Sequence, residues 1–189
     1  MKGKLFILSG PSGVGKGTIR EKILSDSSIN LTYSISMTTR EPRPGELEGI
    51  HYYFVDKKHF KKAIQNNELL EYAMFVGNYY GTPKSTVDDL LNSGHNVLLE
   101  IEVQGAKQVM EKRPDAITIF MIPPSFEELE KRIRGRRSEP EEIVQQRLKK
   151  AKSEMELKKN YKYVVVNDTI ENASNAIINI IENVNKQDE

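Results

Sequence analysis

The sequence predicts an α/β fold: a three-layer α/β/α arrangement in which helices cover both faces of a central parallel sheet. Two observations predict this class. Short apolar runs alternate with segments of helical periodicity, which is the pattern of strand and crossover helix in a parallel sheet. The first apolar run also passes directly into a glycine-rich loop and then into a helical pattern, as is common at the strand ends of such sheets.

Four apolar runs are short and continuous, and each predicts a buried strand. They are Leu5–Leu8, Val97–Ile101, Ala116–Ile122 and Tyr163–Val166. A helical pattern follows each run, at Gly15–Ser25, Val103–Lys112, Ser125–Arg136 and Ile170–Asn185. The last pattern carries a single apolar stripe, which is typical of core packing.

Two segments interrupt this alternation. Residues 32–84 combine short strand patterns with one helix near Lys57–Asn66 and a proline-containing loop, which predicts a small inserted subdomain. Residues 126–147 concentrate arginines around Pro140, which we expect in the first turn of a new helix. The predicted organisation is therefore core (1–31), insert (32–84), core (85–125), lid region (126–147) and core (148–189).

Composition excludes several classes of protein. The 28 basic and 27 acidic residues are nearly balanced, so no global field favours nucleic acid or a membrane surface as a partner. The absence of cysteine excludes disulfides and cysteine-based zinc sites. No apolar run approaches the ~20 residues of a membrane-spanning helix, and the first strand begins too early for a signal peptide. We expect a cytoplasmic protein.

The loop after the first strand has the residues of a phosphate-binding loop. Its members are Gly10, Pro11, Ser12, Gly13, Val14, Gly15, Lys16, Gly17 and Thr18. Glycines let successive N–H groups turn around a phosphate, and Lys16 adds a positive charge for the outer phosphates. The strict pattern has a hydroxyl directly after the lysine, where this chain has Gly17. We therefore expect Mg²⁺ to be held through substrate phosphates and water, with no direct protein ligand assigned.

Arginines at two places could bind further phosphate oxygens. Arg40 and Arg43 flank a Glu-Pro pair in the insert, and planar guanidinium groups suit two-pronged phosphate recognition. Arg132 and Arg136 share one helix face, and Arg147 follows on the next helix. Solvated charged surfaces would explain both groups equally well. Glutamates interleave with the second group and would repel a duplex backbone.

Acidic and aromatic residues supply further candidates. Glu100 and Glu102 end a predicted strand, where they could hold Mg²⁺ through water or accept hydrogen bonds from a second substrate. Tyr52 and Tyr80 could donate hydroxyls to an anion or simply pack. The three histidines are too scattered to predict a metal site or a catalytic triad.

The sequence resembles the guanylate kinase family over nearly its whole length. Five stretches carry the resemblance in the family's order: Gly10–Thr18, Ser34–Glu46, Gly49–Phe54, Glu71–Thr82 and Glu100–Gly105. The resemblance implies a P-loop kinase of purine nucleotide metabolism that transfers the γ-phosphoryl group of ATP to GMP, and to dGMP, with Mg²⁺ as cofactor. It also implies that the insert binds GMP and that a short lid closes over the substrates.

The resemblance assigns roles residue by residue. Arg40, Arg43, Tyr52 and Tyr80 match the clamp on the GMP phosphate. Ser36, Glu71, Thr82 and Glu102 match positions that face the guanine, and Glu100 belongs to the same GMP-side group. Lys16, Arg132, Arg136 and Arg147 match catalytic positions around the transferring group. Asn167 matches a position near the ATP adenine.

Guanine selection follows from hydrogen-bonding groups. Guanine offers N1–H and an exocyclic NH₂ as adjacent donors, and the Glu71 carboxylate can accept both, whereas adenine reverses this pattern. Two alternatives stay open: a guanylate-kinase-like module that binds proteins without catalysis, and another small-molecule P-loop kinase. The sequence leaves the oligomeric state undetermined.

Overall fold

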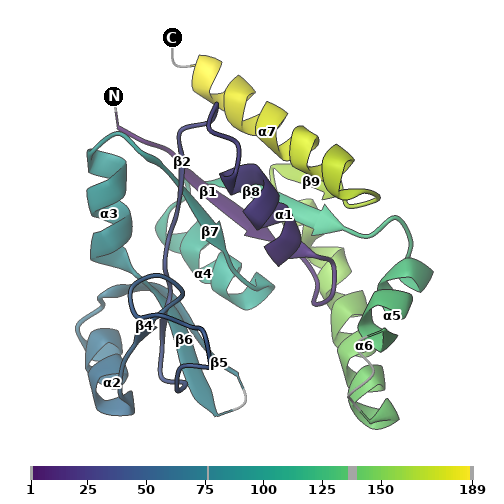
Figure 1. Ribbon diagram of the computed structural model, residues 1–189, viewed down its shortest axis with the longest axis horizontal. Coiled ribbons are helices and arrows are strands. Elements are labelled where there is room, and N and C mark those ends of the chain that lie inside the picture. The colour runs from purple at the N-terminus through teal and green to yellow at the C-terminus, as the bar shows by residue number, and fades with distance from the viewer. Residues whose placement is uncertain (1, 76, 136–139, 188–189) are drawn as a thin grey trace. The chain divides into compact units, whose positions relative to one another are not determined.

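The computed structural model in Figure 1 describes residues 2–75, 77–135 and 140–187. Strands of one sheet follow the order β2-β7-β1-β8-β9. Their bounds are β1 Leu5–Ser9, β2 Leu31–Tyr33, β7 Asn96–Glu100, β8 Ile117–Ile122 and β9 Tyr163–Val166. Strand β8 pairs in parallel with both β1 and β9. The predicted α/β class with a central parallel sheet is confirmed.

The buried strands are those whose sequences are continuously apolar. All five residues of β1 are buried, as are the first five residues of β8. The N–H of Ile101 bonds to the carbonyl of Leu8 at 3.2 Å, which joins the end of β7 to β1. A parallel strand covered on both faces needs apolar side chains on both, so the absence of alternation in these runs has a direct structural cause.

The chain divides into two units. The first unit comprises the chain up to residue 5 together with 32–99 and 104–116, and the second comprises 6–31, 100–103 and the chain from 117 onward. The first unit thus contains the whole of the predicted insert, and the second contains the phosphate loop.

The first unit contains a sheet in the order β4-β3-β6-β5. Its strands are β3 Met37–Thr38, β4 Tyr53–Phe54, β5 Leu69–Phe75 and β6 Asn78–Pro83, with helices α2 Lys57–Gln65, α3 Lys84–Asn92 and α4 Val103–Lys112 in the same part of the chain. Strands β5 and β6 pair antiparallel, and β6 also pairs antiparallel with β3. The sequence predicted α2 and short strands in this segment; β6 was not predicted because glycine and proline in 78–83 obscure the strand pattern, and α3 was not predicted either.

Helix α2 is fixed by a cap and a small core. The Asp56 side chain accepts a hydrogen bond from the His59 N–H at 2.7 Å, which satisfies a free donor of the first turn. Phe60 and Ala63 from this helix pack with Leu69, and the Phe60 ring stacks on Tyr79 at a centroid distance of 5.2 Å. This core holds α2 against β5 and β6.

The second unit carries its helices around β1, β8 and β9. They are α1 Lys16–Leu24, α5 Phe126–Arg134, α6 Glu141–Met155 and α7 Ile170–Lys186, with a 3-10 turn at Glu156–Asn160. Figure 1 shows α1 beside α7, and these two helices contact each other. Helices α5 and α6 share a buried apolar cluster: Leu129, Ile133, Val144, Leu148 and Ala151.

Helix ends in the second unit correct two details of the prediction. Helix α6 begins at Glu141 with Pro140 as its N-cap, one residue later than expected. Helix α5 ends at Arg134, so the predicted range to Arg136 was too long, and Arg136 lies outside the described residues. In the described part of the chain, no helix combines the length and the apolar character needed to cross a membrane.

Candidate functional site

The glycine-rich loop joins β1 to α1 in the second unit. Gly13 and Gly15 have φ values of 86° and 98°, in the left-handed region that favours glycine. A Cβ atom would lie 2.8 Å from Ile133 Cγ1 at position 13, and 2.8 Å from Asn167 Nδ2 at position 15. The loop therefore requires glycine at both positions for backbone conformation and for space.

Lys16 reaches back over this loop. Its Nζ donates to the carbonyls of Gly10 at 2.7 Å and Pro11 at 3.2 Å. Burial lowers the pKa of Lys16, while the nearby carboxylates of Glu100, Glu154 and Glu102 act in the opposite direction. The loop thus surrounds a partly buried ammonium group, which an anion would stabilise.

Two side chains hold the loop from outside. Asn167 Nδ2 donates to the Val14 carbonyl at 2.8 Å, and Arg132 Nη1 donates to the same oxygen at 3.3 Å. Arg132 Nη2 also donates to the Asn167 carbonyl at 3.1 Å. The structure therefore brings Arg132 and Asn167 together at the loop, where both fix its backbone.

Helix α6 contacts the loop at Ser12. Arg147 Nη2 donates to Ser12 Oγ at 3.1 Å, and the Ser12 N–H donates to Glu154 Oε2 at 3.4 Å. Glu154 is buried, and Lys150 lies 3.5 Å from it one turn away. Sequence reasoning found Arg147 but missed Glu154, because a lone glutamate in a charged helix carries no recognisable signal.

Glu100 and Glu102 lie near the phosphate loop. Glu100 forms an ion pair with Arg20 at 2.9 Å, and Glu102 lies 3.8 Å from Lys150. Arg20 was not predicted, although its spacing of four residues from Lys16 places both on one face of α1. Thr18, the loop hydroxyl, is exposed.

Carboxylate oxygens suit Mg²⁺, so Glu100 and Glu102 are chemically suitable for holding the ion through water. Among residues 2–75, 77–135 and 140–187, no three acidic, histidine or cysteine side chains cluster as a ready metal site. Glu100 and Glu102 therefore fit a cation whose other ligands come from nucleotide phosphates and water.

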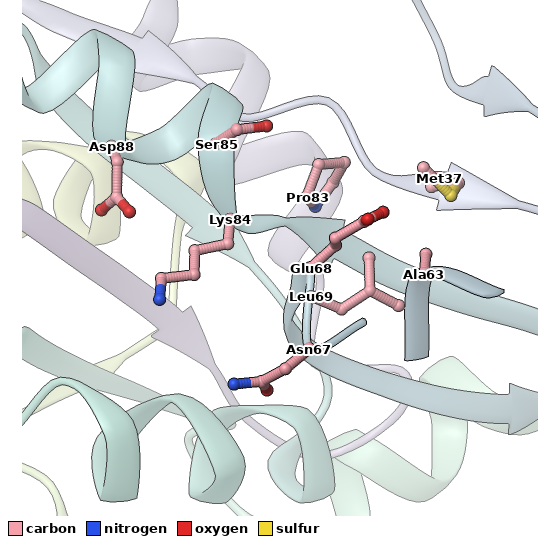
Figure 2. A pocket seen from close by; sticks show the side chains of 9 residues that line it. All are labelled: Met37, Ala63, Asn67, Glu68, Leu69, Pro83, Lys84, Ser85 and Asp88. Carbon is pink, nitrogen blue, oxygen red and sulfur yellow. The ribbon is translucent and has the colours of Figure 1, made fainter. Parts of the chain in front are cut away.

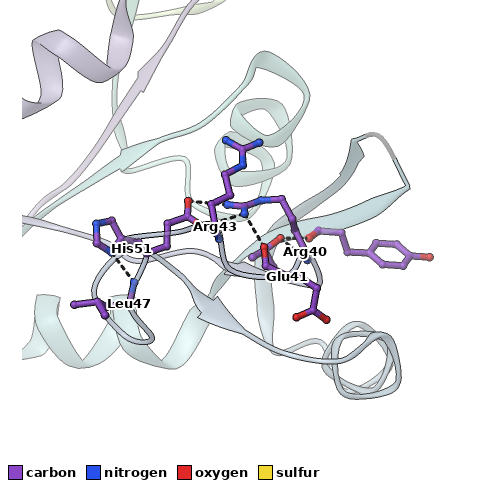
Figure 3. A network of polar contacts seen from close by, with 8 residues as sticks. Arg40, Glu41, Arg43, Leu47 and His51 are labelled. Carbon is purple, nitrogen blue, oxygen red and sulfur yellow. Dashed lines mark hydrogen bonds and ion pairs between the residues drawn. The ribbon is translucent and has the colours of Figure 1, made fainter.

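The predicted phosphate clamp lies in the first unit. Figure 3 shows the polar network around Arg40 and Arg43. Arg40 forms a two-pronged ion pair with Glu46, with both N–O distances at 2.9 Å, and the Arg43 N–H also donates to Glu46 at 2.8 Å. These contacts lower the pKa of Glu46 to about 2. The network fixes the course of the loop that carries both arginines.

Aromatic rings extend this cluster. The Arg40 guanidinium lies 5.4 Å from the Tyr52 ring centre, and the rings of Tyr52 and Tyr80 meet edge to face at 6.1 Å. Arg43 has an exposed side chain on the same loop. The structure thus brings Arg40, Tyr52 and Tyr80 into one cluster. His51, which sequence reasoning left unassigned, accepts from the Leu47 N–H at 2.9 Å and closes the loop (Figure 3).

Glu71 is a buried carboxylate in the same unit. It is 5% exposed, and Thr82 donates its hydroxyl hydrogen to Glu71 Oε1 at 2.6 Å. The hydroxyl hydrogen of Thr82 is thus engaged by Glu71 in this structure. Ser36, on the strand-to-strand connection, is partly buried, and its carbonyl accepts from the Tyr53 N–H at 2.9 Å.

A cavity of about 390 Å³ lies elsewhere in the first unit. Figure 2 shows its lining, which mixes apolar side chains such as Leu69 and Met37 with Lys84 and Asp88. None of the predicted site residues that the structure describes lines this cavity. The candidate binding groups are therefore the phosphate loop in the second unit and, separately, the Arg40 and Glu71 clusters in the first.

Comparisons with known proteins identify the family of this chain. The family model described as "Guanylate kinase" matches residues 2–184. The guanylate kinase of Mesoplasma florum is 53% identical over 95% of this chain, and the chain spans 61% of that relative's length. The guanylate kinase of Latilactobacillus sakei is 52% identical over 96% of this chain and 89% of its own.

Solved structures give the same result. The crystal structure of guanylate kinase from Anaplasma phagocytophilum matches with a TM-score of 0.75 and 38% identity, over 96% of this chain and 85% of that one. The SH3-kinase fragment of tight junction protein 3 matches with a TM-score of 0.51 and 10% identity, over 96% of this chain and 57% of that one, and shows the fold alone. The chain belongs to the guanylate kinase family.

Proposed function

We propose that this protein transfers the γ-phosphoryl group of ATP to GMP, and to dGMP, giving ADP and GDP or dGDP. The observation that carries the proposal is a buried carboxylate, Glu71, in a chain that also has a glycine-rich phosphate loop with Lys16 bonded to its backbone. Family membership supports the same reaction. In this proposal residues 32–84 are the GMP-binding insert and 126–147 the lid.

The phosphate loop would bind the ATP phosphates. Backbone N–H groups of a glycine-rich loop and the positive end of α1 favour an anion there, and the Lys16 ammonium adds a full charge. Asn167 would shape the loop beside the adenine. Mg²⁺, when bound with ATP, would neutralise part of the phosphate charge, with Glu100 and Glu102 as its water-mediated protein partners.

The Arg40 cluster would bind the GMP phosphate. Arg40, Arg43, Tyr52 and Tyr80 supply guanidinium and hydroxyl donors, and a two-pronged guanidinium suits phosphate oxygens as well as it suits Glu46. Glu71 would accept hydrogen bonds from the guanine N1–H and NH₂, with Ser36 and Thr82 beside the base. A buried site of this kind rejects bases that leave its polar groups unpaired.

The reaction needs no protein nucleophile. An oxygen of the GMP phosphate attacks the terminal phosphorus of ATP, and the bond from that phosphorus to the ADP oxygen breaks. Lys16, Arg132 and Arg147 contact the loop at Gly10, Val14 and Ser12, so their charges surround the place proposed for the ATP phosphates. Together with Arg136 they would offset the charge that moves toward the leaving oxygen.

An ADP-release assay tests the proposal against both alternatives. We expect turnover with GMP and dGMP, and turnover at least ~10³-fold lower with AMP, CMP and UMP. Preferential turnover of another acceptor would show a different P-loop kinase. Absence of turnover with every acceptor, despite ATP binding, would contradict the proposed reaction and favour a binding module.

A further inference from the structure

The Glu71 carboxylate lies against the first turn of helix α4 at Gly105. A Cβ atom at position 105 would lie 2.5 Å from Glu71 Oε2 and 3.1 Å from Cδ. The distance to Oε2 is shorter than Cβ contacts in proteins, and the distance to Cδ is tighter than most of them, so the carboxylate would have to shift; Glu71 is buried, which limits that shift. The carboxylate can therefore keep this place only while residue 105 has no side chain.

Backbone conformation does not account for this glycine. Gly105 is the third residue of α4, and its φ lies outside the left-handed region that only glycine adopts readily. Glycine is among the weakest helix formers, so alanine would be the better residue here if space allowed it. The demand for glycine at this position thus comes from Glu71.

The N-terminal end of a helix favours negative charge. The first turn of α4 contains no acidic residue of its own. Glu71, which comes from strand β5, brings a carboxylate to this end of the helix, and Thr82 from β6 fixes its other oxygen at 2.6 Å. The carboxylate is therefore held between a helix start and a neighbouring strand.

We propose that Gly105 is a specificity-positioning residue, whose missing side chain lets the Glu71 carboxylate lie where it selects the purine. This inference rests on the proposed function for the identity of the base. A methyl group at position 105 would displace the carboxylate from α4 and disturb its bond to Thr82. The two guanine donors, N1–H and NH₂, would then no longer find both acceptors in place.

Base selectivity separates positioning from general damage. IMP carries the N1–H of GMP but lacks the exocyclic NH₂, so the ratio of kcat/KM for GMP to that for IMP reports how well the carboxylate receives that second donor. A variant that is only less stable loses activity with both nucleotides equally. A variant with a displaced carboxylate loses the preference for GMP over IMP.

The experiment compares Gly105→Ala with Lys107→Ala, an exposed position on the same helix. For Gly105→Ala we expect kcat/KM for GMP to fall at least ~10-fold, a smaller GMP-to-IMP ratio and an unchanged KM for ATP. Its Tm should also fall, whereas helix propensity alone would raise it by about 2–4 °C. Lys107→Ala should leave the ratio unchanged.

A double variant tests the contact directly. Glu71→Asp shortens the acid by one methylene, so adding Gly105→Ala in that background should lower Tm less than it does in the parent. If Gly105→Ala alone does not fold, its effect in the parent counts as a complete loss of stability, and the double variant should still fold. A raised Tm with an unchanged GMP-to-IMP ratio would overturn the inference. A parental protein that turns over no GMP would instead contradict the proposed function, and the Tm comparison would still decide whether Glu71 requires glycine at 105.

Discussion

Individual residues in both units combine burial with charge, and this combination gives them chemical specificity. Glu71 is buried with Thr82 as a hydrogen-bond donor, and Lys16 is partly buried with loop carbonyls as acceptors. A carboxylate has about four lone-pair sites and an ammonium three hydrogens, so each group can take part in several hydrogen bonds at once. Both are therefore chemically suited to polar ligand groups.

Replacing Glu71 tests guanine selection at the residue scale. Glu71→Ala removes the acceptor for two guanine donors, so we expect kcat/KM for GMP to fall ~10²–10⁴-fold with little change in the KM for ATP. Steady-state kinetics with each substrate varied in turn provides the measurement. Unchanged GMP kinetics would remove the guanine assignment.

The lowered pKa of Lys16 predicts how ATP affinity depends on pH. Only the protonated amine attracts phosphates, and burial lowers the pKa of Lys16 in the free protein. ATP binding stabilises the charged form and raises this pKa. Affinity should therefore be greatest below the free-state pKa and fall up to tenfold per pH unit above it.

Titration calorimetry of ATP binding between pH 7 and pH 10 measures this dependence. The Lys16→Arg variant, whose guanidinium stays charged throughout, serves as the comparison. We expect its affinity to decline less over this range. Equal alkaline declines in both proteins would show that another group titrates.

At the scale of elements, the phosphate loop depends on α5 and on the end of β9. Arg132 from α5 and Asn167 after β9 both donate to the Val14 carbonyl. The resemblance to the guanylate kinase family implied that these residues belong to the site. The sequence did not predict that both bond to one loop carbonyl, since contacts between residues 118 and 153 positions apart have no local signature.

Asn167→Ala tests the contribution of this link. The variant leaves the Val14 carbonyl with a single, longer hydrogen bond, and we expect a loss of about 1–3 kcal/mol in unfolding free energy. Urea denaturation measures this change. Asn175→Ala, at an exposed position of α7, should change stability by no more than about 0.5 kcal/mol. Equal effects of the two substitutions would show that the link contributes little.

For the whole molecule, the sequence predicted the parallel sheet better than it predicted the insert. Continuous apolar runs identified β1, β7, β8 and β9 within a residue or two at each end. Strand β6 was not predicted because Gly81 and Pro83 are poor strand formers. The strand forms nevertheless, because its pairing with β5 overrides that propensity. The roles of Gly105 and Glu154 were also not predicted, because they depend on contacts with residues that are distant in the sequence.

Ion pairs in both units predict how the stability of the molecule depends on pH. Arg40 lowers the pKa of Glu46, and Arg134 that of Glu141, from 4.5 to about 2 in each case. A lowered carboxylate pKa stabilises the folded state above pH 4.5, and this contribution is lost as pH falls toward 2.

The double variant Glu46→Gln/Glu141→Gln should therefore show a smaller loss of Tm between pH 5 and pH 3 than the parent. Thermal unfolding followed by circular dichroism measures the difference, with the exposed Glu111→Gln as the control. Identical losses in the double variant and the parent would contradict the assignment of acid sensitivity to these two pairs.

Equilibrium binding of a linked dinucleotide, in which five phosphates join adenosine to guanosine, tests the central claim most directly. If one chain binds ATP and GMP with their phosphates end to end, this molecule should bind at least ~10²-fold more tightly than ATP or GMP alone. It should also bind more tightly than the matching adenosine–adenosine compound, and Glu71→Ala should abolish that preference. Affinity no greater than that of ATP, with no preference for the guanosine end, would contradict the account.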